Sequence, residues 1–293
     1  MNASLPPLAT AGNRIVRADT GQPVLLRGVN RSGLEYGVRA TREEIRRIVG
    51  EWRANIIRIP FTQRWALDSE DYRRALDDIV RWTAESGAYA LLDLQWLRPD
   101  DDFGVNSNGS VQRIAPLPDA DSARLWRSLA ERYRLEPAVL FDIYNEPHDV
   151  TAADWRHCAR LLVGAIREVH PASLIFVSGT NWGYDLRGVP FPGENLVWST
   201  HVYPSKQPGW HAAFGCAAIE APVFAGEWGT DYDLEWGRSL AAYLRSLGMG
   251  WTAWSWNDWP HLQREGQPTP FGELVKGELQ AARDIFEREA PGI

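Results

Sequence analysis

Two glutamates each follow a short apolar stretch that has the character of a buried strand. Glu146 follows residues 138–144 and stands directly before Pro147, which cannot continue a central strand. Glu227 follows residues 222–226 in the same way. Both carboxylates are therefore expected at the carboxyl ends of core strands. This arrangement predicts chemistry that uses a pair of carboxylates.

The other residues expected at strand ends are polar or aromatic. They are Asn30, Arg58, Gln95, Asn145, His201, Tyr203 and Trp254. His201 and Tyr203 are two residues apart, so they face the same side of their strand. The set holds one histidine and no cysteine, which disfavours a metal site or a serine or cysteine nucleophile. Two carboxylates with such partners are typical of glycosidases, in which one carboxyl group protonates the leaving sugar and the other attacks or activates water.

Composition and charge exclude several other classes of function. The net charge is −7, and the basic residues, almost all arginines, alternate with acidic ones, which argues against a nucleic-acid partner. No apolar run approaches the roughly 18 residues of a membrane span. The two cysteines have no metal-binding spacing, and no G-x-G-x-x-G or P-loop motif occurs. We therefore expect no metal, no cofactor and no membrane partner, and a monomeric protein.

The first residues carry no signal of secretion. Residues 1–17 have neither a basic start nor an apolar centre. This predicts a cytoplasmic protein, or a secreted one if a leader has been removed.

Strand-like and helix-like segments alternate about eight times along the chain, without a linker between them. The expected strands are 24–30, 55–60, 88–94, 138–144, 174–178, 196–203, 222–225 and 250–255. Such alternation means parallel strands joined by helices. It predicts a single-domain (β/α)₈ TIM barrel over residues 1–293, with a short N-terminal hairpin that pairs residues 13–16 with the segment from Pro23. A doubly wound sheet is the alternative, but it usually opens with a glycine-rich phosphate loop.

Local signals place some of the helices and one long loop. Thr41 and Glu44 form a capping box in the sequence, and Gly87 is suited to end the helix 69–86. Residues 96–118 show no periodicity. A loop of that length after the third strand is expected to border the catalytic cleft and to help set substrate length.

The chain resembles glycoside hydrolase family 5, the cellulase-like family of clan A. The matching stretches, in family order, are 26–30 (LRGVN), 55–60 (NIIRIP), 144–147 (YNEP), 201–203 (HVY), 226–229 (GEWG) and 254–255 (WS). They extend over nearly the whole chain, and six ordered matches are far more specific than one Asn-Glu-Pro triplet.

The resemblance implies a role for each matching residue. Glu146 would be the acid/base and Glu227 the nucleophile, with Arg58 and Tyr203 beside Glu227. Asn145 would bind the 2-hydroxyl of the sugar. His201 would contact Glu146 or the sugar, and Trp254 would stack under the sugar, often with a cis peptide bond after it.

One position departs from the family pattern. Gln95 stands where the family usually has histidine, and glutamine cannot become cationic. It is expected to point into the cleft, within reach of Glu146, Asn145 or the sugar. Tyr36 and Trp182, on predicted loops, are further candidates for sugar contact, since flat aromatic rings stack on sugars; the alternative for each is packing. Likewise, His201 could be a core histidine, and the two glutamates could form salt bridges at the rim.

These observations predict a retaining glycosidase that cleaves β-linked bonds in an oligo- or polysaccharide. A β-glucan is the first expectation for the substrate, and a β-mannan or a small β-glucoside is an alternative. A weakly catalytic carbohydrate-binding barrel and a transglycosidase also remain open.

Overall fold

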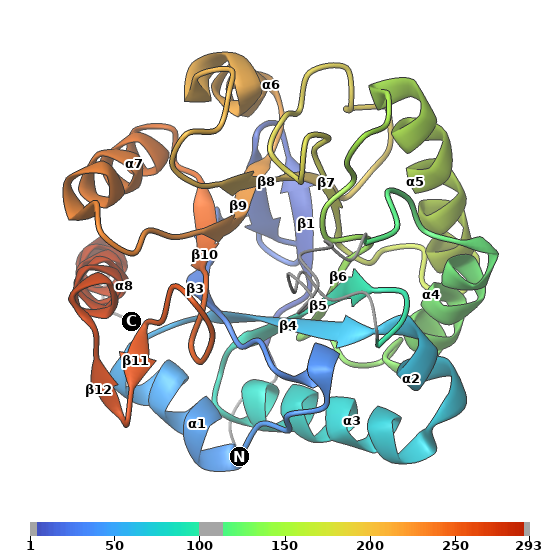
Figure 1. Ribbon diagram of the computed structural model, residues 1–293, viewed down its shortest axis with the longest axis horizontal. Coiled ribbons are helices and arrows are strands. Elements are labelled where there is room, and N and C mark those ends of the chain that lie inside the picture. Colours follow the sequence, from blue (N-terminus) through green and yellow to red (C-terminus); the bar gives the residue numbers. More distant parts are fainter. Residues whose placement is uncertain (1–4, 100–113, 290–293) are drawn as a thin grey trace, which may run out of the picture.

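The computed structural model describes residues 5–99 and 114–289. Within these residues, eight parallel strands form a closed barrel in the order β10-β3-β4-β5-β6-β7-β8-β9. Figure 1 shows the helices arranged around this ring of strands. The predicted (β/α)₈ TIM barrel is confirmed. The barrel strands are β3 (Arg27–Asn30), β4 (Ile56–Thr62), β5 (Tyr89–Trp96), β6 (Val139–Asp142), β7 (Ile175–Ser178), β8 (Leu196–Val202), β9 (Val223–Trp228) and β10 (Gly250–Ala253).

The helices lie between the strands in sequence, as a barrel requires. They are α1 (Arg42–Arg46), α2 (Gln63–Asp68), α3 (Glu70–Glu85), α4 (Ala120–Arg132), α5 (Ala152–Arg167), α6 (Cys216–Glu220), α7 (Leu234–Ser246) and α8 (Pro270–Glu289). The capping box at α1 is present, because the Thr41 hydroxyl accepts from the Glu44 N–H and the Glu44 carboxylate accepts from the Thr41 N–H. Gly87 follows α3 with φ 85°, a value that favours glycine. None of the described helices is long and apolar enough to cross a membrane.

Alternation along the strands divides the buried residues into an outer and an inner set. Outward-facing residues such as Ile57 and Leu92 pack against the helices. The inner set forms an apolar layer at the amino-terminal side of the barrel. Its strand members are Ile56, Tyr89, Leu91, Leu140, Phe176, Val197 and Phe224, and Leu26 joins them directly before β3.

The N-terminal hairpin differs from the predicted one. Strand β1 (Leu8–Ala11) pairs with β2 (Arg14–Arg17), whereas Pro23 makes only an isolated bridge to Val16. Pro23 has no N–H to donate to a ladder. The contact of this segment with β2 is therefore short, with the Val24 N–H donating to the Ile15 carbonyl and the Arg17 N–H to the Gln22 carbonyl. The buried side chain of Leu8 joins the inner apolar layer, so this hairpin packs against the amino-terminal mouth of the barrel.

A second small sheet, β11 (Gln263–Arg264) with β12 (Gln267–Pro268), lies between β10 and α8 in sequence. Residues 100–113 of the predicted long loop lie outside the described residues, so its position at the cleft stays a prediction.

Candidate active site

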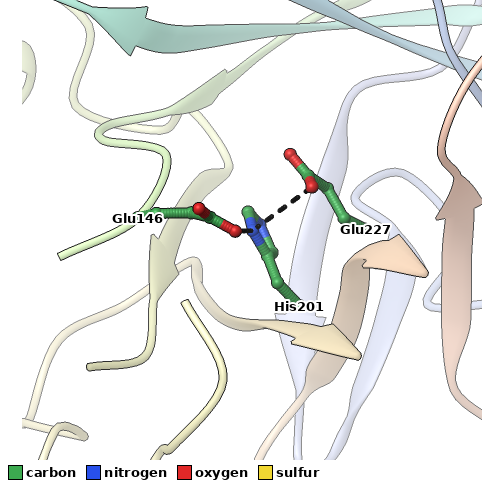
Figure 2. Close-up of side chains that lie close together, drawn as sticks. All are labelled: Glu146, His201 and Glu227. Carbon is green, nitrogen blue, oxygen red and sulfur yellow. Dashed lines mark hydrogen bonds and ion pairs between the residues drawn. The ribbon is translucent and has the colours of Figure 1, made fainter. Parts of the chain in front are cut away.

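Along the strands toward their carboxyl ends, the polar residues of the site occupy the first and second inward-facing positions after the apolar layer of the barrel. Two residues after Ile56, Leu91 and Leu140 come Arg58, Asp93 and Asp142. Glu227, near the end of β9, and Glu146, just after β6, lie at the carboxyl ends of their strands. Figure 2 shows these two carboxylates on either side of His201, from β8. The fold therefore brings the two predicted glutamates together.

Glu227 is held by two donors. Arg58 Nη1 donates to its Oε1 at 2.9 Å, and the Tyr203 hydroxyl donates to its Oε2 at 2.7 Å. An opposite charge and a hydrogen bond both stabilise the ionised carboxylate. Burial, and then the charge of Glu227, raise the pKa of Tyr203 well above its usual value, so this phenol stays a donor.

Glu146 has a different environment. Burial raises the pKa of its carboxyl group to about 7, and the opposing charges of Lys206, Arg58 and His148 limit the rise. Its Oε1 lies 2.9 Å from His201 Nδ1. The two carboxyl groups therefore have unequal environments: Glu227 is held by a guanidinium and a phenol, whereas burial raises the pKa of Glu146, an asymmetry that acid–nucleophile pairs use.

His201 is fully buried between the two glutamates. Its Nδ1 lies 2.9 Å from Glu146 Oε1 and 3.7 Å from Glu227 Oε2. Burial lowers the pKa of this imidazole to about 3. The ring is therefore neutral at neutral pH, with one N–H and one lone pair.

Arg58 is the centre of the buried polar network. Its guanidinium donates from Nε to Asp142, from Nη1 to Asn30 and Glu227, and from Nη2 to Asn145, and Nη2 is also ion-paired with Asp93 at 2.9 Å. Burial alone would lower the pKa of Arg58, but the three carboxylates outweigh it and raise that pKa. Burial raises the pKa of Asp93 well above its usual range and that of Asp142 to about 6. One buried cation thus organises three acidic groups and two amides.

Asp93, Asp142, His148 and Lys206 were not singled out from the sequence as site residues. A signal existed for the two aspartates, because each stands two positions after an inward-facing leucine on a core strand. No sequence signal marks Lys206, whose ammonium group reaches the carbonyl oxygens of Asn181 and Trp182.

Gln95 and Trp254 lie at the carboxyl ends of β5 and β10. Gln95 follows Asp93 on the inward face of β5 and is 7% exposed, and its Oε1 has no hydrogen-bond partner among the described residues. The indole N–H of Trp254 donates to the Trp259 carbonyl, and its peptide bond to Ser255 is cis, as the family resemblance implies.

Trp182 and Tyr36 lie near the same end of the barrel. The Trp182 ring stacks on His148 with 3.6 Å between centroids, and the backbone N–H of Trp182 donates to the carbonyl of Pro147, which directly follows Glu146. Tyr36 is 39% exposed, and its hydroxyl lies 3.4 Å from Ser32 Oγ. Ser32 in turn lies 3.2 Å from Ser255 Oγ, beside Trp254.

Within the described ranges, one cluster offers the donor atoms that a metal ion would need. One atom each from Glu146, His201 and Glu227 lies within 4.8 Å of the others. However, Arg58 and Tyr203 occupy both oxygens of Glu227, and the guanidinium charge at 2.9 Å opposes a second cation there. The geometry therefore favours proton transfer over metal binding.

Comparison with known proteins gives the family directly. The profile of the family described as cellulase (glycosyl hydrolase family 5) matches residues 18–259. Among curated proteins, endoglucanase MaCel5A of Microbulbifer sp. (strain ALW1) is 25% identical over 277 residues, covering 86% of this chain and 51% of that protein. Endoglucanase A of Butyrivibrio fibrisolvens is 27% identical over 240 residues, covering 76% and 52%. The chain thus spans about half the length of these relatives.

Solved structures show the same fold. A β-glucanase from Saccharophagus degradans, in complex with cellotetraose, superposes with a TM-score of 0.80 at 21% identity, covering 96% of this chain and 95% of that one. The catalytic domain of Thermobifida fusca endoglucanase Cel5A, also with cellotetraose, gives 0.77 at 20% identity, covering 94% and 97%. The profile match over most of the chain, together with the ordered motifs, shows that this protein belongs to the cellulase family, glycosyl hydrolase family 5.

Proposed function

We propose that this protein hydrolyses β-glycosidic bonds with net retention of configuration. The observation that carries the proposal is the pair of unequal carboxyl groups, Glu227 held by a cation and a phenol and Glu146 with a pKa of about 7. An oxygen of each lies within 4.8 Å of the other. This supports the retaining separation of about 5–5.5 Å over the inverting one of about 6.5–9.5 Å.

In the first step, Glu227 attacks the anomeric carbon while Glu146 gives its proton to the glycosidic oxygen. The bond to the leaving sugar breaks, and an ester forms between the sugar and Glu227. In the second step, Glu146 removes a proton from water, which attacks the anomeric carbon and releases Glu227. Glu146 therefore alternates between acid and base.

Asn145 is suited to hold a sugar hydroxyl during both steps. Its Oδ1 accepts from Arg58 Nη2 at 2.9 Å, which fixes the orientation of the amide. Its NH₂ group is then the side of the amide that can donate to the 2-hydroxyl. Arg58 thus orients both Glu227 and Asn145.

A β-linked glucan is the substrate that the relatives support best. The curated relatives are endoglucanases, and two solved structures of the same fold contain cellotetraose. Trp254, Trp182 and Tyr36 supply aromatic rings at this end of the barrel, which suits the apolar faces of sugar rings.

The test combines a panel of β-linked oligosaccharides with two variants. Glu227→Ala should abolish turnover on every substrate. Glu146→Ala should lose the least activity on substrates that have an acidic leaving group, since such a leaving group needs little protonation. Azide should then rescue Glu227→Ala with an α-glycosyl azide product and Glu146→Ala with a β-glycosyl azide product.

Reversed anomers, or full activity in either variant, would refute the assignment of roles. Product analysis also separates the alternatives: transfer to a second sugar identifies a transglycosidase, and binding without turnover identifies a carbohydrate-binding barrel.

A further inference from the structure

The second ring nitrogen of His201 has no explained partner. Nδ1 faces Glu146, whereas Nε2 is buried without a hydrogen-bond partner among the described residues. Buried polar nitrogens are rarely left unpaired, because an unmade hydrogen bond costs the full desolvation of the group. The surroundings of Nε2 must therefore supply a partner.

Ser199 is a nearby polar side chain that is suited to this role. It precedes His201 by two residues on β8, is fully buried, and its Oγ also has no partner among the described residues. Both atoms border Gly226: a Cβ at that glycine would lie 2.4 Å from Ser199 Oγ and 3.1 Å from His201 Nε2. The two atoms are thus close enough for one water with two bonds of about 2.8 Å to bridge them.

The polar path continues across the neighbouring strands. Ser199 is the ladder partner of Ser178 on β7, whose hydroxyl is likewise buried and unpaired among the described residues. The Ser178 hydroxyl lies close to the Asp142 carboxyl on β6. Burial raises the pKa of that carboxyl, and the Ser178 hydroxyl partly lowers it again. Asp142 Oδ2 accepts from Arg58, and its Oδ1 is unpaired among the same residues. The four groups stand on three adjacent strands beneath the catalytic carboxylates.

We propose that Asp142, Ser178 and Ser199, together with internal water, form a buried chain of hydrogen bonds, or relay. This relay accepts a hydrogen bond from the Nε2–H of His201. A carboxylate only accepts hydrogen bonds, so Asp142 orients the Ser178 hydroxyl toward itself. The Ser178 oxygen then accepts a hydrogen bond from the Ser199 hydroxyl. The Ser199 oxygen in turn accepts a hydrogen bond from a water molecule, which accepts one from the His201 Nε2–H. The relay therefore favours the tautomer with its proton on Nε2.

The direction of these hydrogen bonds affects the protonation of Glu146, and at this point the inference rests on the proposed function. With the proton on Nε2, the Nδ1 lone pair accepts from protonated Glu146, so the relay stabilises the acid form that the first step needs. The other charged or titratable groups that face this pair are Arg58 from β4, Glu227 from β9, and His148, Tyr203 and Lys206 from the loops after β6 and β8. Ser178 and Ser199 are thus positioning residues that act through His201.

Ser199→Ala and Ser178→Ala test the relay. Each should shift the alkaline limb of the kcat/KM profile to lower pH by about 0.4–1 unit, the equivalent of one net hydrogen bond. Ser199→Thr, which keeps the hydroxyl, should restore the limb. In protein with ¹⁵N-labelled histidine, His201 should carry its proton on Nε2 in the wild type and lose this preference in Ser199→Ala.

Thr200→Val is the matched control. Thr200 is the next residue on β8, and its hydroxyl donates to the Tyr184 carbonyl on the opposite face of the strand. Thr200→Val should lower the stability of the protein without shifting the alkaline limb of the kcat/KM profile or changing the tautomer of His201. An unchanged limb and tautomer in both serine variants would overturn the relay. A wild type without turnover on any glycoside would refute the proposed function instead, and the tautomer measurement would still decide the relay.

Discussion

At the scale of single residues, the site depends most on Arg58. This side chain is fully buried, donates hydrogen bonds to Asn30, Asp142, Asn145 and Glu227, and forms an ion pair with Asp93. A lysine has three donors on a single nitrogen and cannot reproduce this planar arrangement.

Arg58→Lys is therefore expected to lower both activity and stability. Unpairing buried carboxylates typically costs about 3–5 kcal/mol, and the misplaced Glu227 should lower kcat at least about a hundredfold. Urea unfolding and steady-state kinetics measure the two effects. Arg39→Lys is the control, because the Arg39–Asp71 pair is exposed and such pairs contribute only about 0–1 kcal/mol. Equal losses in the two variants would contradict the argument.

Gln95 is the residue at which this chain departs from its family. It is inward-facing, nearly buried, and retains an unpaired Oε1 among the described residues. Since an amide can both donate and accept, a sugar hydroxyl is a fitting partner. We expect Gln95→Ala to lower kcat/KM on the best substrate while Gln95→His retains more of it. Unchanged turnover in Gln95→Ala would show that the side chain plays no part in the reaction.

At the scale of elements, tryptophans on two helices fix the strand ends that carry the site. The Trp126 indole on α4 donates to the Ile143 carbonyl just beyond β6, at 2.9 Å. The Trp155 indole on α5 donates to the Ser178 carbonyl at the end of β7, at 2.7 Å. These bonds attach two helices to the segments that present Glu146 and the proposed relay.

Trp126→Phe should destabilise the protein by about 1–3 kcal/mol beyond any packing loss, because it leaves a buried carbonyl without its donor. Trp52→Phe is the matched control: Trp52 is equally buried, but its indole nitrogen has no hydrogen-bond partner among the described residues. Chemical denaturation of both variants checks the difference. A Trp52→Phe loss as large as that of Trp126→Phe would assign the effect to packing alone.

At the scale of the whole molecule, buried carboxyl groups link stability to pH. Burial raises the pKa of Glu35 to about 8, of Glu146 to about 7 and of Asp142 to about 6. Each of these groups binds more protons in the folded than in the unfolded state between its two pKa values. Folding stability should therefore be greatest near pH 4.5 or below, as far as these groups contribute, and fall as pH rises toward 8.

Glu35→Gln isolates one contribution. Glu35 is buried and its carboxylate accepts from the Gly33 N–H at 2.6 Å. Removing its titration should flatten the loss of stability between pH 5 and pH 8, an effect on the order of 4 kcal/mol for a shift of this size. Denaturation at several pH values measures the slope. The exposed Glu43→Gln is the control, and an unchanged slope in Glu35→Gln would contradict the prediction.

The sequence by itself determined the barrel, the family and the two glutamates that come together at its mouth. These follow from local patterns: apolar strands that end in polar residues, helical periodicity between them, and the rule that parallel strands share a carboxyl edge. Trp52, Trp126 and Trp155 recur at helical spacing in the sequence, which is typical of core residues, and all three are fully buried. The predicted hairpin was only partly right, because β1 pairs along the whole of β2 whereas the segment from Pro23 makes a short antiparallel contact with it.

Only the tertiary structure decided how the residues act on one another. The pKa of Glu146 depends on burial by several strands at once, and the five partners of Arg58 come from four strands and the loop after β6. The tertiary structure also sets the surroundings of the two ring nitrogens of His201: Nδ1 faces Glu146, whereas Nε2 is buried without a partner among the described residues. Residue types and spacing specify positions along one strand. Desolvation and hydrogen bonding depend on distances between strands, and only barrel closure sets those distances.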